Sequence, residues 1–436
     1  MPNNIKNIWN SSNLLHSYRA QVVLFCCAAI YGMLWSAEAI ISISMILLAL
    51  MAFVEVDYPS SENAKLKIGL RKNIRAQLKG KKIWWWITVP FLLVLFSVFY
   101  SEDWIYTLER LRIKLPFLIL PFAFAVMPSL RKKELKIIGT FFVLACTIAA
   151  IGVLWNYFQN FADINYNISR GKAIPTPSNH IRFSLSIACA IFCAAALTFE
   201  KKNLGIKGVK YIFGLLTFFL FIFLHILSVR SGLLAFYAAL GVFLIQFIYR
   251  SRRWKIGLAG IIAMIAIPYF AVIYVPSFKN KYYYMKHDMH SYLEGNGKNY
   301  SDSERLISLN AASEIIAQHP IIGVGAGDLK KEMYQVYANK SAEDAAEKMP
   351  HSQFVTVTAG TGIVGLILFL ISFFVPLFYQ RNYRNYLFTA LHVVFFMSFF
   401  SENTFENNFG LSLWLFMLLI GMSHLTQQKY HGRSTP

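Results

Sequence analysis

The chain has 436 residues, of which 56% are hydrophobic and only 15% are charged, whereas a soluble domain carries roughly 25% charged residues. This composition argues against a soluble enzyme, and the apolar residues come in blocks of about 17–22, the length that crosses ~30 Å of hydrocarbon. The net charge of +20 would suggest nucleic acid in a soluble protein, but basic loops held in the cytoplasm explain it here. We therefore expect an all-α polytopic membrane protein with no nucleic-acid partner.

Twelve apolar blocks predict twelve transmembrane helices. They cover residues 20–36, 39–54, 83–100, 115–128, 136–157, 180–199, 211–228, 232–249, 256–275, 352–375, 386–401 and 411–426. The five cysteines all lie inside these blocks, at Cys26, Cys27, Cys146, Cys189 and Cys193. We expect them to be buried as small hydrophobic side chains.

Basic residues concentrate in both tails and in every second connection between the predicted helices. They are Lys6 and Arg19 in the N-terminal tail, Lys65 to Lys82 in the second connection, Arg131 to Lys136 in the fourth, Lys201 to Lys210 in the sixth, Arg250 to Lys255 in the eighth, Arg381 and Arg384 in the tenth, and Lys429 and Arg433 at the C-terminus. Basic loops stay on the cytoplasmic side. Both termini are therefore predicted to be cytoplasmic.

One outer connection, at residues 276–350, is far longer than any other. Loops of this length are uncommon and usually functional. Apolar residues at helical spacing after Ser303 predict a helix that ends at His319-Pro320, and residues 328–348 favour a second short helix. The loop divides one integrated membrane domain into three parts, at residues 1–275, 276–350 and 351–436.

Ionisable side chains at the outer membrane edge are candidates for a site, because charges near hydrocarbon are costly. Arg230 lies between two apolar blocks with almost no intervening turn; it could bind a phosphate through its guanidinium fork or anchor the helix by snorkelling. Arg305 begins the loop helix and could equally be a solvated surface charge. His351 lies at the start of a predicted span, where a neutral imidazole could accept a proton or cap the helix.

Two further groups of outer residues are weaker candidates for substrate binding. His180 and Arg182 lie in the first turn of a predicted span, where packing against a neighbouring helix is the alternative role. Arg110 and Arg112 form a basic cluster in an outer connection. The cluster could attract an anionic lipid headgroup or simply neutralise nearby acidic residues.

Three segments, in this order and rough spacing, resemble the bacterial O-antigen ligase family, whose membrane domain is shared with O-antigen polymerases and some protein O-oligosaccharyltransferases. The segments are Ser-Val-Arg-Ser-Gly at 228–232, Arg305 with the following His-Pro-Ile-Ile-Gly-Val-Gly at 319–325, and His351-Ser-Gln with glycines at 360 and 365. The resemblance covers most of the chain but is sharp only from about residue 228 to residue 366.

The resemblance implies a GT-C-like glycosyltransferase architecture with its active site on the periplasmic side. It implies transfer of a glycan from undecaprenyl diphosphate to lipid A core, with membrane lipids around the site. A polymerase that extends a growing glycan on the same carrier is the close alternative. By position, Arg230 and Arg305 would hold the diphosphate, and His351 would act as the base or position the acceptor.

No metal or other cofactor is expected, because the first outer connection, Ser36 to Glu38, is too short to present an acidic pair to a metal ion. A transporter or flippase would need acidic residues within the membrane and two related halves, and the predicted spans contain almost no acids at mid-membrane. A purely structural scaffold gives no reason for the long outer loop. Glycosyl transfer is therefore the favoured function.

Overall fold

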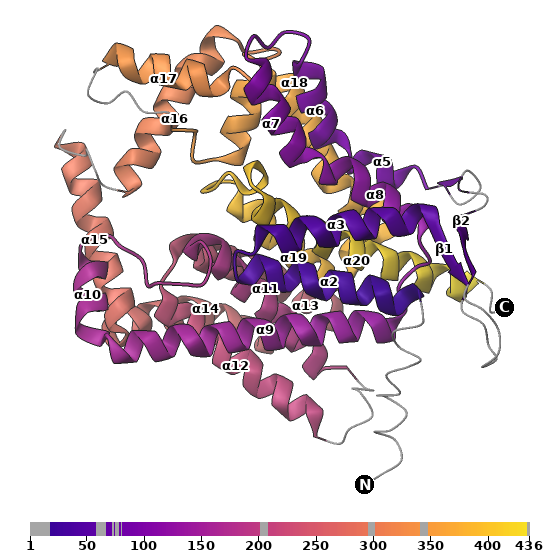
Figure 1. The fold of residues 1–436 in the computed structure, drawn as a ribbon. Coiled ribbons are helices and arrows are strands. Elements are labelled where there is room, and N and C mark those ends of the chain that lie inside the picture. Colours follow the sequence, from indigo (N-terminus) through magenta and orange to yellow (C-terminus); the bar gives the residue numbers. More distant parts are fainter. Residues whose placement is uncertain are drawn as a thin grey trace.

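A computed structural model describes residues 18–57, 67–71, 74, 78–79, 81–200, 208–294, 301–340 and 348–433. Within these residues the protein is a bundle of helices with one short β-hairpin (Figure 1). Several basic residues used in the topology prediction lie outside the described residues, namely Lys6, Lys65, Lys72, Arg75, Lys201, Lys202 and Lys207.

Every predicted span falls on helix in the structure. The corresponding helices are α2 (Tyr18–Leu34), α3 (Glu38–Phe53), α5 (Ile83–Trp86) with α6 (Val89–Ser97), α8 (Pro116–Val126), α9 (Lys132–Gln159), α11 (His180–Thr198), α12 (Val209–Leu227), α13 (Arg230–Ser251), α14 (Trp254–Tyr274), α18 (Gln353–Phe378), α19 (Tyr386–Ser398) and α20 (Asn408–Arg433). In the described part of the chain, seven helices are long and apolar enough to cross a membrane by length and composition. The protein is thus a polytopic all-α membrane protein, while the count of twelve spans stays a prediction.

Several elements differ from the sequence-based expectation. A hairpin of β1 (Val54–Asp57) and β2 (Lys67–Leu70), paired antiparallel, occupies part of what was expected to be a simple basic loop. Helices also form where only connections were expected, at α7 (Trp104–Lys114), α10 (Phe161–Ser169) and α15 (Pro276–Leu293). The predicted loop helices are present as α16 (Ser301–Gln318) and α17 (Leu329–Lys340), and two 3₁₀ turns, η2 (Tyr379–Arg384) and η3 (Thr404–Glu406), complete the described elements.

The connections expected outside, called here the outer connections, meet one another at one end of the bundle. This outer end is where α10, α15 and α16 lie (Figure 1). Each of three contacts joins two connections that are far apart in sequence: the Ser36 hydroxyl donates to the carbonyl of Pro177 (3.5 Å), the Tyr100 hydroxyl donates to that of Ile322 (3.0 Å), and Arg305 pairs with Glu402 (3.3 Å). The long loop therefore folds back over the other outer connections.

The basic connections meet at the opposite end, where β1 and β2 lie (Figure 1). The contacts there are Arg19 with the carbonyl of Ser129 (3.3 Å), Lys132 with Glu200 (2.8 Å) and Arg250 with the carbonyl of Arg384 (2.5 Å). The charge alternation read from the sequence thus corresponds to two physical ends of the bundle.

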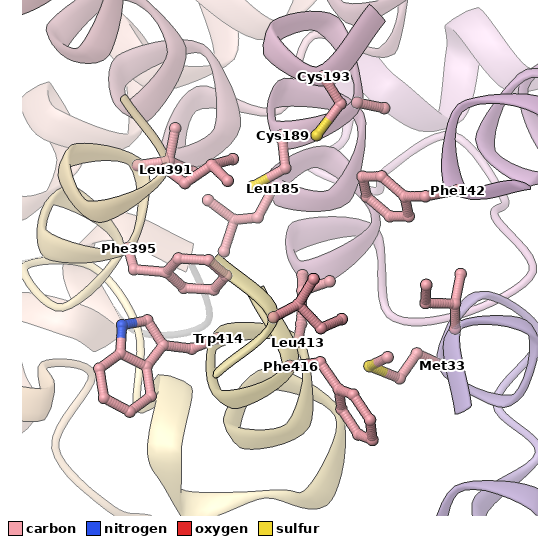
Figure 2. Packing of buried hydrophobic residues seen from close by; sticks show 14 of the residues in the cluster. Met33, Phe142, Leu185, Cys189, Cys193, Leu391, Phe395, Leu413, Trp414 and Phe416 are labelled. Carbon is pink, nitrogen blue, oxygen red and sulfur yellow. The ribbon is translucent and has the colours of Figure 1, made fainter. Parts of the chain in front are cut away.

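Helix α11 lies at the centre of the packed core and contacts α9, α12, α13 and α19. Figure 2 shows Leu185, Cys189 and Cys193 of α11 facing Phe142 of α9 and the side chains of α19 and α20. The described cysteines form no disulfide, and all but Cys27 are fully buried, as expected from their apolar surroundings. Since helices in lipid associate largely through close packing, this well-packed helix is a fixed support for the polar residues at its outer end.

Candidate functional site

Arg230 is held at the outer end of the bundle by an abrupt reversal of the chain. Helix α12 ends at Leu227, Ser228 adopts a left-handed conformation (φ 51°), and α13 begins at Arg230 itself. A side chain at Gly232 would collide with Ser184 of α11, so the glycine lets the two helices approach closely just below Arg230. The Arg-Ser-Gly sequence therefore fixes the position of the guanidinium relative to α11.

Arg305 is positioned by the N-terminus of α16, which a buried aspartate caps. Asp288 of α15 is fully buried and accepts hydrogen bonds from the backbone N–H of Asp302 (2.8 Å) and of Ser303 (3.2 Å), and from the Ser303 hydroxyl (2.5 Å). A carboxylate at a helix N-terminus satisfies backbone donors that have no partner inside the helix and matches the helix dipole. The cap therefore ties the start of α16 to α15.

The capped helix brings Arg305 and Arg230 to one carboxylate. Asp302 accepts a short hydrogen bond from Arg230 and lies 3.9 Å from the Nη1 of Arg305. Arg305 also pairs with Glu402, at 3.3 Å. The two arginines, which are 75 residues apart in sequence, thus share Asp302 across α13 and α16.

Glu402 extends this network toward α11. Burial raises the pKa of the Glu402 carboxyl, against the opposing effects of the nearby Arg305 and Arg182. Arg182 is placed by Asn179, whose side chain caps α11 by accepting from the backbone N–H of Ile181 (3.1 Å) and of Arg182 (3.4 Å). Three arginines and two carboxylates therefore alternate across the outer ends of α13, α16, α19 and α11.

A cavity of about 470 Å³ opens beside this network. Its wall is formed by residues 168–181, the junction of α12 and α13, and the starts of α15 and α16; the ionisable side chains in it are Lys172, His180, Arg230, Lys281 and Arg305. Among its described lining residues there is no carboxylate, because Asp302 and Glu402 approach the arginines from outside the wall. A cavity lined by cations is suited to a small polyanion.

His351 lies against the same helix as Arg305 but does not line the cavity. Its backbone N–H donates to the hydroxyl of Ser308 (3.4 Å). Ser308 follows Arg305 by three residues and therefore lies on the same face of α16. Burial lowers the pKa of the His351 imidazole, and the charges of Arg305 and Lys348 lower it further, against Glu304. The imidazole is therefore neutral at pH 7 and can accept a proton.

The glycines of the two later motifs dock the loop on α18. The N–H of Gly325 donates to the carbonyl of Gly360 (2.9 Å), and the N–H of Ile363 donates to the carbonyl of Pro320 (2.9 Å). Gly323 (φ 72°) and Gly362 (φ 67°) both have a positive φ, which favours glycine. A side chain on either glycine would collide with the backbone of the other segment. The segment at 320–325, which lay between the two predicted loop helices, is thus a main-chain docking surface that fixes the far end of α16.

The basic cluster on α7 lies in a different environment. Arg110 pairs with Glu109 (3.2 Å) and Glu406 (3.6 Å), and the buried Lys114 pairs with Glu406 at 2.6 Å. Arg112 is exposed. The structure does not bring Arg110 or Arg112 to the cavity that holds Arg230 and Arg305, whereas His180 lines it and Arg182 lies beside it.

Sequence reasoning missed the acidic partners and one cation of this site. Asp302 lies three residues before Arg305 in the sequence, which was the one available signal, whereas nothing in the sequence linked Glu402 to an arginine of the site. Lys281 and Asp288 lie in α15, which was not predicted as a helix, so no spacing pointed to them.

Comparison with known proteins bears directly on the motifs that form this site. Residues 215–370 match a family model described as O-antigen ligase, and this range includes Arg230, Arg305 and His351. The chain is also 25% identical over 359 residues to an uncharacterized protein of Haemophilus influenzae. The aligned region covers 78% of this chain and 84% of that protein. The resemblance inferred from the three motifs is thus confirmed, because residues 215–370 of this polytopic membrane protein are similar to the O-antigen ligase family.

Proposed function

We propose that the protein transfers a glycan from undecaprenyl diphosphate to an acceptor hydroxyl at the periplasmic face of the bacterial inner membrane. The observation that carries this proposal is the placement of Arg230 and Arg305 on one shared carboxylate beside a cation-lined cavity of about 470 Å³. The basic connections lie at the opposite end of the bundle, which supports a periplasmic position for the cavity.

The chemistry follows from the charge that develops on the leaving group. The acceptor oxygen forms a bond to the anomeric carbon while the bond from that carbon to the diphosphate oxygen breaks. Arg230 and Arg305 neutralise the departing diphosphate. The neutral His351 takes the proton of the attacking hydroxyl, and in-line attack inverts the anomeric centre.

The two arginines make a metal ion unnecessary for stabilising the leaving group in this mechanism. We therefore expect purified protein in nanodiscs, given lipid-linked donor and acceptor, to retain its rate of transfer in EDTA. Complete loss of transfer in EDTA that Mg²⁺ or Mn²⁺ restores would contradict the proposed mechanism.

The acceptor distinguishes a ligase from a polymerase, and lipid A core is our first choice. Cells that lack the protein should then accumulate full-length glycan on undecaprenyl diphosphate, with lipid A core left unmodified. Accumulation of single repeat units on the carrier would instead assign the polymerase reaction. Analysis of carrier-linked glycans by mass spectrometry separates the two outcomes.

A further inference from the structure

We infer that Lys281 is a third donor-binding cation that contacts the diphosphate directly; this inference rests on the proposed function. Lys281 lies in α15, outside the predicted spans, and lines the same cavity as Arg230 and Arg305. Arg230 lies on α13 and Arg305 on α16, so the three cations reach the cavity from three different helices. A diphosphate bears two adjacent anionic groups, and three cations can engage both of them.

Two neutral groups hold the Lys281 side chain in place. Its ammonium donates to the carbonyl of Gly171 (2.9 Å) and lies 5.2 Å from the centroid of the Tyr284 ring. Gly171 adopts a left-handed conformation (φ 91°), and a side chain there would collide with Tyr284. The glycine therefore leaves room for the Tyr284 ring beside residue 171, whose carbonyl accepts the hydrogen bond from Lys281.

The charge of Lys281 is less compensated than that of either arginine. Arg230 pairs with Asp302, and Arg305 pairs with Glu402, whereas no carboxylate of the described residues lies within 4.0 Å of the Lys281 ammonium. Asp288 and Asp302 act on it only from beyond that distance, and a partly buried cation that is not paired with a carboxylate gains most from a bound anion. Lys172, the other lysine of the cavity wall, is exposed, so among the partly buried cations Lys281 is the one whose local environment most favours a phosphate.

The protonation of Lys281 should be sensitive to pH in the alkaline range. Burial lowers the pKa of the Lys281 ammonium to about 8, and Arg230 adds to this effect. The charged and titratable groups that face it are Arg230 of α13, His180 of α11, Asp302 and Arg305 of α16, and Asp288 and Tyr284 of its own helix. The ammonium is charged below pH 8 and loses its proton as the pH rises through this value, so binding of an anion should weaken there.

The test is the affinity for undecaprenyl diphosphate and for inorganic pyrophosphate of protein in nanodiscs. Lys281→Gln, which can keep the hydrogen bond to Gly171, should weaken binding of both probes at least about tenfold, which corresponds to about 1.4 kcal/mol. Lys281→Arg should restore the affinity and abolish its decline above pH 8, because a guanidinium stays charged. Lys286→Gln, which removes a charge from an exposed position of the same helix, should bind like the wild type.

The outcomes separate this inference from the proposed function. If Arg230→Ala weakens binding but Lys281→Gln binds like Lys286→Gln, the inference about Lys281 is wrong and the donor site stands. If the wild type binds neither probe, the inference about Lys281 and the proposed function are both wrong. If Lys281→Gln does not fold, the pH profiles of the wild type and Lys281→Arg decide, and identical profiles overturn the inference.

Discussion

Replacement of His351 with alanine should slow glycosyl transfer about 10²–10⁴-fold, the range that a general base contributes, while donor affinity stays close to that of the wild type. The base acts on the acceptor hydroxyl, so its loss affects the chemical step and not the binding of diphosphate. Single-turnover rates and donor affinities in nanodiscs measure the two effects separately.

The pH dependence of glycosyl transfer is a second test of the role of His351. Because burial and Arg305 lower the pKa of His351 below its ordinary value of 6.5, the imidazole stays neutral at pH 7 and becomes protonated only in more acidic solution. Wild-type transfer should therefore fall as the pH drops through this lowered pKa and stay constant above it until other groups titrate. His290→Ala, which removes an exposed histidine, is the control; near-normal turnover of His351→Ala would rule out the base assignment.

Arg230→Lys and Arg305→Lys should each reduce transfer about ten- to hundredfold and weaken donor binding as well. A charge-assisted hydrogen bond contributes about 1.5–3 kcal/mol, and a lysine ammonium cannot reproduce the paired donors of a guanidinium. Alanine at either position should have a larger effect, because it also leaves Asp302 or Glu402 without its partner. Rates and affinities measured on the same nanodisc preparations would show both losses.

The matched control for the arginines is Arg253→Lys, an exposed position at the basic end of the bundle, which should leave transfer unchanged. A fully active Arg305→Lys together with a fully active Arg305→Ala would show that the loop does not hold the diphosphate. Arg182, which lies near Glu402 from the α11 side, would then be the next residue to test.

The spans and the loop helix α16 could be predicted because their signals are local. Apolar blocks of membrane length, a charge bias between connections and helical spacing after Ser303 all lie within short windows of sequence. Helix α15 was missed because it is polar and rich in tyrosine, and its buried residues, Ser277, Tyr284, Asp288 and Ser291, give no apolar periodicity. The β-hairpin was missed because its short strands lie within a basic connection.

The site was predictable in part for the same physical reason. Arg230 and Arg305 stand out as guanidinium groups in connections expected at the membrane edge, but their shared carboxylate requires the start of α16 to lie beside the start of α13, which no local pattern encodes. Arg110 illustrates the same limit: its neighbour Glu109 was visible in the sequence as a possible partner, whereas Glu406, almost 300 residues later, was not. Pairings over such distances depend on tertiary structure.

The docking of the glycine segment at 320–327 on α18 has a consequence for biosynthesis. The chain is made from its N-terminus, so the loop is synthesised before the helix that receives it. Until Gly360 and Ile363 follow, the segment lacks the main-chain partners that hold it, and Arg305 lacks Glu402 until α19 is complete. Assembly of the proposed donor site is therefore timed to the end of translation, and incomplete chains carry Arg230 without the later residues of that site.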